Sequence, residues 1–423
     1  MQELTIFITQ SLLGWLSIQM CLTLVFLLCV RGGEFSPTEE LLKDDQLPKT
    51  AVILCLRGAD PYLPNCIEGL LSQNYPQYDL KVIVDSQQDP AWQIVTDIIK
   101  AQNAHHVQLS FLRNIRHNCS LKCSCLLQAV SELDDSYQAI ALVDSDTIVH
   151  NNWLRELIIP LANPQVGVTS GNRWYVPSDK YWGSLVRYIG NISTVVQMYL
   201  FQVPWGGSLA MKTEVLHHTE LLTQWGQALG EDFIMHKILK KHKLRVKFVP
   251  SLIMLNREEC DLFGLIESLQ RLFLYSRFYH PQWWAIVGDV ISSILFPFLA
   301  IVLLLLSLLD TRWDLATVLL ATYSIYTVGL LLITLILELG ISPTIRSQGQ
   351  PITKLSLKII SKIFIAIPLT QWIYGLAFFS SLWSSTVRWR GIVYRVQSPG
   401  NVRLVEYHPY DFLDQPIDSK ISL

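Results

Sequence analysis

The sequence predicts a membrane protein of the α/β class: a mostly parallel sheet domain with an N-terminal transmembrane helix and a C-terminal group of transmembrane helices. Half of the 423 residues are hydrophobic and only 16% are charged, whereas an average soluble chain carries about 25% charged residues. Uncharged runs long enough to cross a bilayer lie near both ends. Between them, short apolar runs of strand length alternate with helical patterns, which is typical of a sheet covered by helices.

The charge balance and the aromatic content exclude two other classes of protein. The chain has 33 basic and 35 acidic residues and a net charge of −2, so it lacks the basic surface that binding to nucleic acid phosphates requires. Trp, Tyr and Phe make up 11% of the residues, which is ample material for a packed core, and disorder is excluded. We therefore expect a membrane, and no nucleic acid, among the partners.

The first predicted element is a transmembrane anchor in residues 1–32. No charge lies between Glu3 and Arg31, and the run Leu4–Val30 exceeds the roughly 20 residues that a spanning helix needs. A cleaved signal peptide is the alternative. It is disfavoured because a basic start and an A-x-A cleavage site are missing and the apolar stretch is too long.

Residues 49–255 carry the alternating pattern and are predicted to form one sheet domain. Continuous apolar runs such as AVILCL indicate strands that are buried on both faces. The predicted strands are Ala51–Leu56, Leu80–Val84, Val107–Leu112 and Ala139–Val143, and the predicted helices between them are Pro64–Leu71 and Trp92–Ala101.

Acidic residues follow three of the four predicted strands. Asp60 comes after the first, Asp85 and Asp89 after the second, and Asp144 and Asp146 after the fourth. In an open sheet of this kind ligands bind outside the carboxyl ends of the strands. Carboxylates that converge there favour a divalent cation carrying a phosphate ligand.

The pair Asp144 and Asp146 is the strongest metal candidate among these acids. The two residues flank one position, so the period of a strand places both carboxylates on the same side. Hard oxygen ligands of this kind suit Mg²⁺ or Mn²⁺, which leaves other coordination positions to diphosphate and water. The alternative is a turn at the strand end, capped by an aspartate.

A third acid, Asp232, lies at the predicted start of a helix with the sequence EDFIMHKILKKH. It is interpreted either as a helix cap stabilised by the dipole or as a base that accepts the proton of an attacking hydroxyl.

Between the pair Asp144 and Asp146 and the later Asp232 lies a loop that contains Trp205, Gly206 and Gly207. Paired glycines let the backbone approach a ligand closely, and Trp205 offers an apolar face to a sugar ring or a lipid. A tight packed turn would use the same residues. Trp174 and Tyr175 either wall the same cleft or belong to the core.

Beyond residue 255 the sequence returns to the membrane. Residues 256–288 include an amphipathic stretch, Leu262–Phe278, with the pattern of an interfacial helix. Residues 289–385 form the predicted C-terminal transmembrane region, and residues 386–423 form a tail. The predicted spans are Val290–Leu309 and Leu315–Leu337, and a third stretch, Ile363–Trp383, either crosses the membrane or dips into it and returns.

Basic residues gather on both sides of that last stretch. They are Arg346, Lys354, Lys358 and Lys362 before it, and Arg388, Arg390, Arg395 and Arg403 after it. The positive-inside rule places both clusters, and with them the sheet domain, on the cytoplasmic side if the stretch is re-entrant.

Several segments together resemble the membrane-bound family of ceramide glucosyltransferases and related processive-type glycosyltransferases. They are the opening Arg57–Pro61, the stretch Asp89–Ala91, the acids described above, and Trp389–Val396, which is similar to a closing W-R-G-x-x-Y-R-V signature. The resemblance extends from about Ala51 to Val396 and implies a GT-A, Rossmann-like fold.

The resemblance also implies roles for individual residues. Asp85 or Asp89 would bind a uridine nucleotide, Asp144 and Asp146 would hold the metal and diphosphate, and Asp232 would be the catalytic base. The family's (Q/R)-x-x-R-W motif corresponds to Ser268–Leu272, which keeps Arg271 and replaces both ends of the motif. Arg271 is then either a diphosphate ligand or a cation that snorkels to the membrane interface.

These expectations describe an inverting hexosyltransferase that moves a sugar, with glucose preferred, from a UDP-sugar to the hydroxyl of a membrane lipid such as ceramide or diacylglycerol. A processive polysaccharide synthase and an inactive membrane scaffold are the alternatives. The choice between glucose and galactose depends on one or two hydrogen bonds in the pocket, so the sequence leaves both the donor sugar and the acceptor lipid open.

Overall fold

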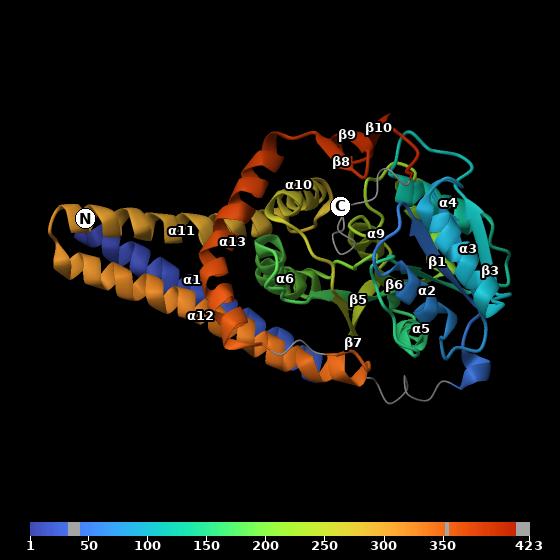
Figure 1. Cartoon of the computed structure of the whole chain (residues 1–423), viewed down its shortest axis with the longest axis horizontal. Coiled ribbons are helices and arrows are strands. Elements are labelled where there is room, and N and C mark those ends of the chain that lie inside the picture. The colour runs from blue at the N-terminus through green and yellow to red at the C-terminus, as the bar shows by residue number, and fades with distance from the viewer. Residues whose placement is uncertain (33–42, 352–354, 412–423) are drawn as a thin grey trace.

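The computed structural model describes residues 1–32, 43–351 and 355–411. A rounded α/β body occupies one end of the molecule, and a bundle of long helices projects from it (Figure 1). Lys354 of the first basic cluster and residues 412–423 of the predicted tail lie outside the described residues.

Seven strands form the central sheet, in the order β3-β2-β1-β4-β6-β5-β7. The strands β3, β2, β1 and β4 are parallel, β6 is antiparallel to both of its neighbours, and β7 is parallel to β5. The mostly parallel sheet confirms the predicted fold class. The strands are β1 (Thr50–Leu56), β2 (Tyr78–Val84), β3 (Val107–Phe111), β4 (Ala139–Val143), β5 (Val166–Tyr175), β6 (Ser208–Lys212) and β7 (Arg245–Asn256).

Helices cover both faces of this sheet, which explains why β1 has no polar side. Ala51 and Ile53 point into one apolar core, which α4 covers, whereas Val52 and Leu54 point into a second core beneath α2, α3 and α5. The helices and 3₁₀ turns of the body are η1 (Asp44–Gln46), α2 (Leu63–Leu71), α3 (Pro90–Gln102), α4 (Leu121–Ser131), α5 (Trp153–Ile158), η2 (Ile159–Ala162), α6 (Trp182–Phe201), α7 (Thr213–His218), α8 (Leu221–Trp225) and α9 (Met235–Lys241).

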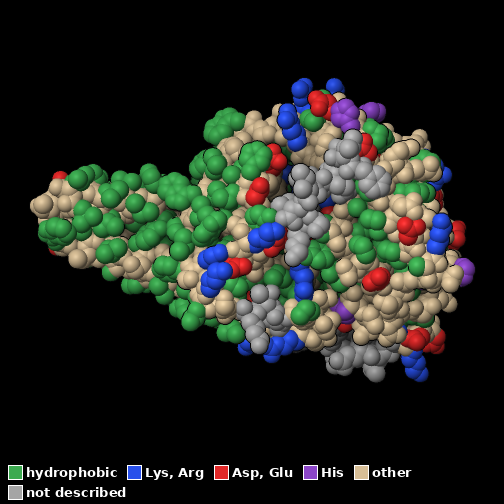
Figure 2. Space-filling view, viewed as in Figure 1, with side chains coloured by type: hydrophobic (Ala, Val, Ile, Leu, Met, Phe, Trp, Pro, Cys, Tyr) green, Lys and Arg blue, Asp and Glu red, His purple; other side chains and the backbone are tan. Residues whose placement is uncertain are grey.

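Four helices of the described chain are long and apolar enough to cross a membrane: α1 (Gln2–Arg31), α11 (Trp283–Leu309), α12 (Trp313–Ser347) and α13 (Leu357–Trp383). Of these, α1, α11 and α12 form the projecting bundle, whose surface is largely hydrophobic (Figures 1 and 2). Leu28 and Leu309 on that surface are 71% and 79% exposed. Such a surface fits lipid rather than water.

The helix α12 continues ten residues beyond the predicted end of its span at Leu337. Glu338, the first residue beyond the predicted span, is buried, and its carboxylate accepts hydrogen bonds from Trp174 Nε1 (2.9 Å) and Tyr188 OH (2.8 Å). The charge is therefore satisfied inside the protein, and the helix runs on against the α/β body.

The helix α13 lies across the base of the bundle instead of running along it (Figure 1). Both of its ends contact the α/β side of the molecule. At its start, Lys358 forms an ion pair with Asp179 (2.6 Å) and Lys362 donates to the Asp179 carbonyl (2.7 Å). At its end, Arg277 donates to the Ser381 carbonyl (2.8 Å). This arrangement favours the re-entrant interpretation of the stretch Ile363–Trp383.

Arg277 belongs to α10 (Leu262–Tyr279), which coincides with the amphipathic helix expected from the sequence. Its apolar residues Leu265, Leu269 and Phe273 are buried in one cluster with Ala377 and Phe378 of α13. Together α6, α10 and α13 form a layer between the sheet and the bundle (Figure 1).

The chain ends in a second, antiparallel sheet that the sequence analysis did not anticipate. Its strands are β8 (Thr386–Trp389), β9 (Ile392–Ser398) and β10 (Asn401–Glu406), in the order β10-β9-β8. Arg390 and Gly391 both have positive φ, 44° and 75°, as a tight two-residue hairpin turn requires. Val387, Ile392 and Tyr394 are buried in the core beside α4, so this sheet is part of the α/β body.

Candidate functional site

The site begins at the end of β4, where the chain leaves the sheet. Asp144 Oδ1 accepts a hydrogen bond from Lys122 Nζ at 2.6 Å, and the same ammonium lies 2.6 Å from Glu231 Oε1. Asp146 Oδ2 accepts from Asn256 Nδ2 at 2.7 Å. The residues of the D-x-D pattern therefore contact both α4 and the end of β7.

Asp232 is not a helix cap, so this part of the expectation was wrong. Residues 231–234 form a turn and α9 begins at Met235, with Ile234 in the capping position. The Asp232 carboxylate instead accepts from the Gly206 backbone N–H through Oδ2 (3.1 Å) and from the Phe233 N–H through Oδ1 (2.8 Å). The Asp232 carboxylate therefore binds the backbone of the loop at Gly206 and does not cap α9.

The two adjacent glycines bring the acids together. Gly206 is held by Asp232, and a Cβ atom on Gly207 would lie 2.6 Å from Asp144 Oδ2. A Cβ atom on Gly206 would clash with the Glu231 carboxylate. Only glycine allows this close approach. The structure therefore gathers Asp144 and Asp232, which are far apart in the chain, at one loop.

The carboxylates of the site carry a surplus of negative charge. Burial, followed by the charges of Asp144 and Asp60, raises the pKa of Asp146 to about 6. Burial and the charge of Glu231 raise the pKa of Asp232 to about 7, although Lys122 opposes this shift. Both shifts mean that the ionised forms lack sufficient compensating charge.

Arg173, near the end of β5, is the cation that faces these acids. Its guanidinium lies 5.8 Å from the centre of the Trp205 ring and 5.5 Å from that of Tyr175. Burial alone would lower the pKa of Arg173, but Tyr175, Asp146, Asp144 and Asp232 together raise it. No motif in the sequence marks Arg173 as a site residue.

Arg271 is turned toward the site and not toward lipid. Its guanidinium lies 5.8 Å from the centre of the Trp389 ring. The pKa of Arg271 is lowered by burial, and the nearby charges of Arg390 and Arg173 add to this effect. A cation held next to other cations is poised for an anion, so the geometry favours the diphosphate interpretation over snorkelling.

The predicted nucleotide contacts Asp85 and Asp89 are engaged with the protein itself. Asp85 pairs with Arg57 and accepts from Tyr407 OH at 3.0 Å. Asp89 caps α3 by accepting from Ala91 N (2.8 Å) and also accepts from Gly58 N (2.8 Å). Burial raises the pKa of both carboxylates.

The C-terminal sheet closes this side of the site. Arg390 donates to Asp60 and to the Arg57 carbonyl, and Arg57 in turn donates to the Arg390 carbonyl through Nε (3.0 Å). Arg57 also donates to the His408 carbonyl at 2.7 Å. The closing signature around Arg390 is thus joined directly to the residues after β1.

The aromatic residues divide between site and core. Trp205 is 5% exposed, and its Nε1 has no hydrogen-bond partner among the described residues. Tyr175 lies beneath Arg173 and Arg187, with centroid distances of 5.5 and 4.1 Å. Trp174 donates to Glu338 and packs in the core between α6 and α12, so it does not wall the cleft.

Comparison with known proteins identifies the family. The profile of glycosyl transferase family 21 matches residues 15–402, which is most of the chain. The chain belongs to glycosyl transferase family 21. This confirms the resemblance to ceramide glucosyltransferases, and family 21 membership makes the protein a glycosyltransferase.

Two solved structures are similar to this family 21 chain. One is the mannosyltransferase PcManGT from Pyrobaculum calidifontis in complex with GDP-Man and Mn²⁺, with 13% identity and a TM-score of 0.48, covering 89% of this chain and 99% of that one. The other is GalNAc-T7 with UDP, GalNAc and Mn²⁺, with 14% identity and a TM-score of 0.38, covering 51% of this chain and 44% of that one.

The donor set of this family 21 site fits a divalent metal that shares its ligands with a substrate. In the described part of the chain, no group of three or more His, Cys, Asp or Glu side chains lies close enough to hold an ion alone. Mg²⁺-type ions typically take one or two carboxylates and complete their coordination with phosphates and water. The two carboxylates of Asp144 and Asp146 provide that number.

Several residues of the site were not found from the sequence, among them Lys122, Arg173, Asn256 and Glu258. Lys122 lies in a cysteine-rich helix, Arg173 within a strand, and Glu258 just after β7. Burial, together with Asp146 and Asp60, raises the pKa of Glu258 to about 8. The position of Glu258 beyond a strand end was a usable signal, whereas nothing local marks Lys122.

Proposed function

We propose that this glycosyltransferase transfers a hexose, with glucose preferred, from a UDP-sugar to the hydroxyl of a membrane lipid, with inversion at the anomeric carbon. The convergence of Asp144 and Asp232 on Gly206 and Gly207 carries the proposal. Asp144, which is suited to hold a metal that binds diphosphate, then lies at the same loop as Asp232, which is suited to accept a proton. A binding scaffold would need neither the Asp232 carboxylate nor its raised pKa.

The donor half of the site would hold the diphosphate. Asp146 and Asp144 would hold Mn²⁺ or Mg²⁺, which stabilises negative charge on a departing diphosphate when bound. Arg271 and Arg173 would pair with phosphate oxygens, since both are buried cations facing the site. Asp85 or Asp89 would contact the nucleotide, and the contact between Asp85 and Tyr407 would have to open for Asp85 to do so.

Asp232 is the proposed base. A pKa of about 7 makes its carboxylate both available and basic near neutral pH. It would accept the proton of the acceptor hydroxyl as the hydroxyl oxygen forms a bond to the anomeric carbon. The bond from that carbon to the diphosphate oxygen breaks on the opposite face, and the electron pair leaves with UDP. No covalent enzyme intermediate is needed.

The acceptor is proposed to be a lipid because membrane helices adjoin the site. Tyr374 of α13 meets Gly190 of α6, where a Cβ atom would clash with the phenol. Tyr374 lies close enough to Arg173 and Arg187 to interact electrostatically with both guanidinium groups. A lipid held along α13 would therefore place its polar end near the sugar loop. Ceramide and diacylglycerol both fit this description.

We also propose that the α/β body faces the cytoplasm. With α13 lying across the bundle, three helices would span the membrane, and both basic clusters would remain on the side of the α/β body. The contacts of Lys358 with Asp179 and of Arg390 with Asp60 support this placement. The positive-inside rule then assigns that side to the cytoplasm.

The test is transfer by purified protein supplied with UDP-glucose or UDP-galactose, Mn²⁺ and a panel of lipids. We expect a glycolipid with inverted anomeric configuration, assigned by NMR. Asp232→Asn should lower the rate roughly 10²–10⁴-fold, the usual contribution of a general base, whereas the exposed control Asp135→Asn should not. Unchanged transfer by Asp232→Asn would remove the proposed base, and a growing polymer would indicate a polysaccharide synthase.

A further inference from the structure

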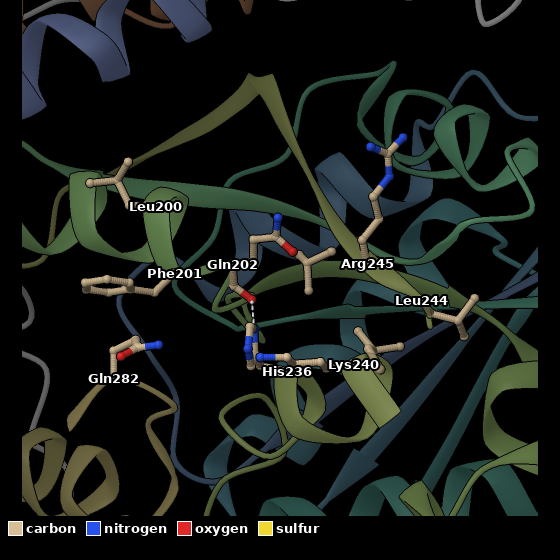
Figure 3. Close-up of a pocket in the computed structure, with 10 residues that line it drawn as sticks. Leu200, Phe201, Gln202, His236, Lys240, Leu244, Arg245 and Gln282 are labelled. Atoms are coloured by element: carbon tan, nitrogen blue, oxygen red, sulfur yellow. Dashed lines mark hydrogen bonds between the residues drawn. The ribbon is translucent and has the colours of Figure 1, made fainter. Parts of the chain in front are cut away.

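We propose that a cavity beside α9, separate from the transfer site, binds the phosphate group of an anionic membrane lipid. The cavity has a volume of about 360 Å³ and lies between the end of α6, the helix α9 and the residue before α11 (Figure 3). Its polar wall includes Gln202, His236, Lys240 and Gln282. This inference goes beyond the proposed function, because none of the carboxylates of the transfer site lines the cavity.

The polar side chains of this cavity lack partners within the protein. In the described chain, no hydrogen bond or ion pair joins the side chains of Gln202, Lys240 or Gln282 to another residue. His236 makes one long contact, from Nδ1 to the Gln202 carbonyl at 3.4 Å. Figure 3 shows Lys240 extending toward His236. Gln202, Lys240 and Gln282 are all exposed to solvent, so three groups able to donate hydrogen bonds line one space and are available to an acceptor that displaces water.

The charge around the cavity is positive. No acidic residue lines it, and Arg245 lies on its rim with the guanidinium extending away (Figure 3). Nearby, Lys237, Lys241 and Lys243 are exposed, and among them Lys241 is compensated by Glu220 at 2.6 Å. The whole chain has a net charge of −2, so this concentration of positive charge is local. It favours an anion over a neutral ligand.

The position of the cavity selects a lipid over a soluble anion. Gln282 immediately precedes α11, one of the predicted spans, and Trp284 just beyond it is 79% exposed, as is typical of a membrane interface. Leu200 and Phe201 form the apolar wall, and Phe201 packs against His280 with ring centroids 5.5 Å apart. A phosphate on the polar wall would place its glycerol and first acyl carbons on this apolar wall.

A lysine at the end of a helix has a simpler explanation, since it stabilises the helix dipole. That explanation accounts for Lys240 and Lys241 equally. It does not account for a cavity without acidic residues, or for the apolar wall beside the polar one. A headgroup phosphate accounts for all of these features.

The test uses full-length protein in phosphatidylcholine nanodiscs, titrated with short-chain phosphatidylglycerol, with bound lipid counted by native mass spectrometry. Because one basic side chain near a surface contributes about fivefold in affinity, Lys240→Gln should weaken binding about fivefold and Lys240→Arg should restore it. Lys237→Gln is the matched control, because it removes an exposed charge from the same helix without lining the cavity.

A second arm replaces the lipid with inorganic phosphate. If free phosphate at the same concentration occupies the protein to the same extent as the lipid, the assignment to a lipid is overturned. If wild type and Lys240→Gln bind the lipid equally, the site itself is overturned. Sugar transfer is measured separately on the same variants. If Lys240→Gln loses lipid binding but keeps transfer, the inference stands independently of the proposed reaction; if wild type binds the lipid without any transfer, only the proposed reaction fails.

Discussion

Replacing Gly207 by alanine tests the close packing of the transfer site. The added Cβ would lie 2.6 Å from Asp144 Oδ2 and would overlap the ring of Trp205. An ordinary contact is 3.4 Å or more, so the carboxylate would have to retreat by 3.4 − 2.6 = 0.8 Å. The φ angle of Gly207 is not positive, so the substitution adds no backbone strain and the steric effect is isolated.

The retreat would disturb the charge contacts of Asp144. Its Oδ1 lies 2.6 Å from Lys122 Nζ, and a shift of the carboxylate by 0.8 Å would lengthen this contact to at most 2.6 + 0.8 = 3.4 Å. Overpacking typically costs about 1–3 kcal/mol; if that cost falls on the position of Asp144 that transfer requires, kcat/KM decreases roughly 5- to 150-fold at 1.4 kcal/mol per tenfold change. The carboxylate proposed to hold the metal is displaced, so the Mn²⁺ concentration at half-maximal activity should also rise.

The assay is initial-rate transfer from UDP-sugar to lipid across a Mn²⁺ series, with Gly288→Ala as the control. Gly288 lies in α11, where an added Cβ meets nothing within 4 Å. We expect Gly288→Ala to match wild type in both kcat/KM and Mn²⁺ requirement. If Gly207→Ala stays within twofold of this control in both measurements, Asp144 is not part of a tightly packed metal site and the reasoning is refuted.

Three further predictions concern pH, metal and the C-terminal sheet. Because Asp232 must be ionised to accept a proton, the transfer rate should rise with pH and reach half its maximum near pH 7, and Glu231→Gln should move this limb to lower pH by removing a like charge; a pH-independent rate would contradict both. EDTA should abolish transfer and Mn²⁺ restore it, with Asp146→Asn requiring more Mn²⁺ than wild type; full activity in EDTA would argue against a metal. Arg390→Ala should lower the apparent melting temperature and speed proteolysis of the C-terminal sheet, because breaking the buried ion pair between Arg390 and Asp60 costs about 3–5 kcal/mol. The exposed control Arg388→Ala should leave both unchanged, and equal behaviour of the two variants would show that this ion pair does not hold the sheet in place.

Strands buried on both faces were predictable from the sequence. The four strands β1 to β4 agree with their predicted ranges to within two residues at each end. The apolar runs of β1 and β4 have no polar side because helices cover both faces of the sheet, and a continuous run has a sharp beginning and end. The strand β3 lies at the edge of the sheet, and none of its residues is fully buried. The helix α10 was predictable because its apolar residues Leu265, Leu269 and Phe273 recur at helical spacing on one face, which packs against α13.

Tertiary contacts explain where prediction failed. Asp232 looks like a helix cap locally, but the Gly206 N–H competes for its carboxylate and the helix starts three residues later. Glu338 lies just beyond the predicted span, but Trp174 and Tyr188 satisfy its charge from distant parts of the chain. Lys122 and Arg173 carry no local mark, because their importance comes from acids that only folding brings near. The division of the chain into domains and the roles of the site residues stay predictions.

The exchange of hydrogen bonds between Arg57 and Arg390 joins residues 333 positions apart. A ribosome makes the first strand of the sheet early and the hairpin that holds Arg390 only after every long apolar helix has emerged. Since domains begin to fold during synthesis, the nascent α/β body lacks these contacts of Arg57 until the residues of all four long apolar helices have been made. This side of the site is therefore the last part of the described α/β body to be completed during synthesis.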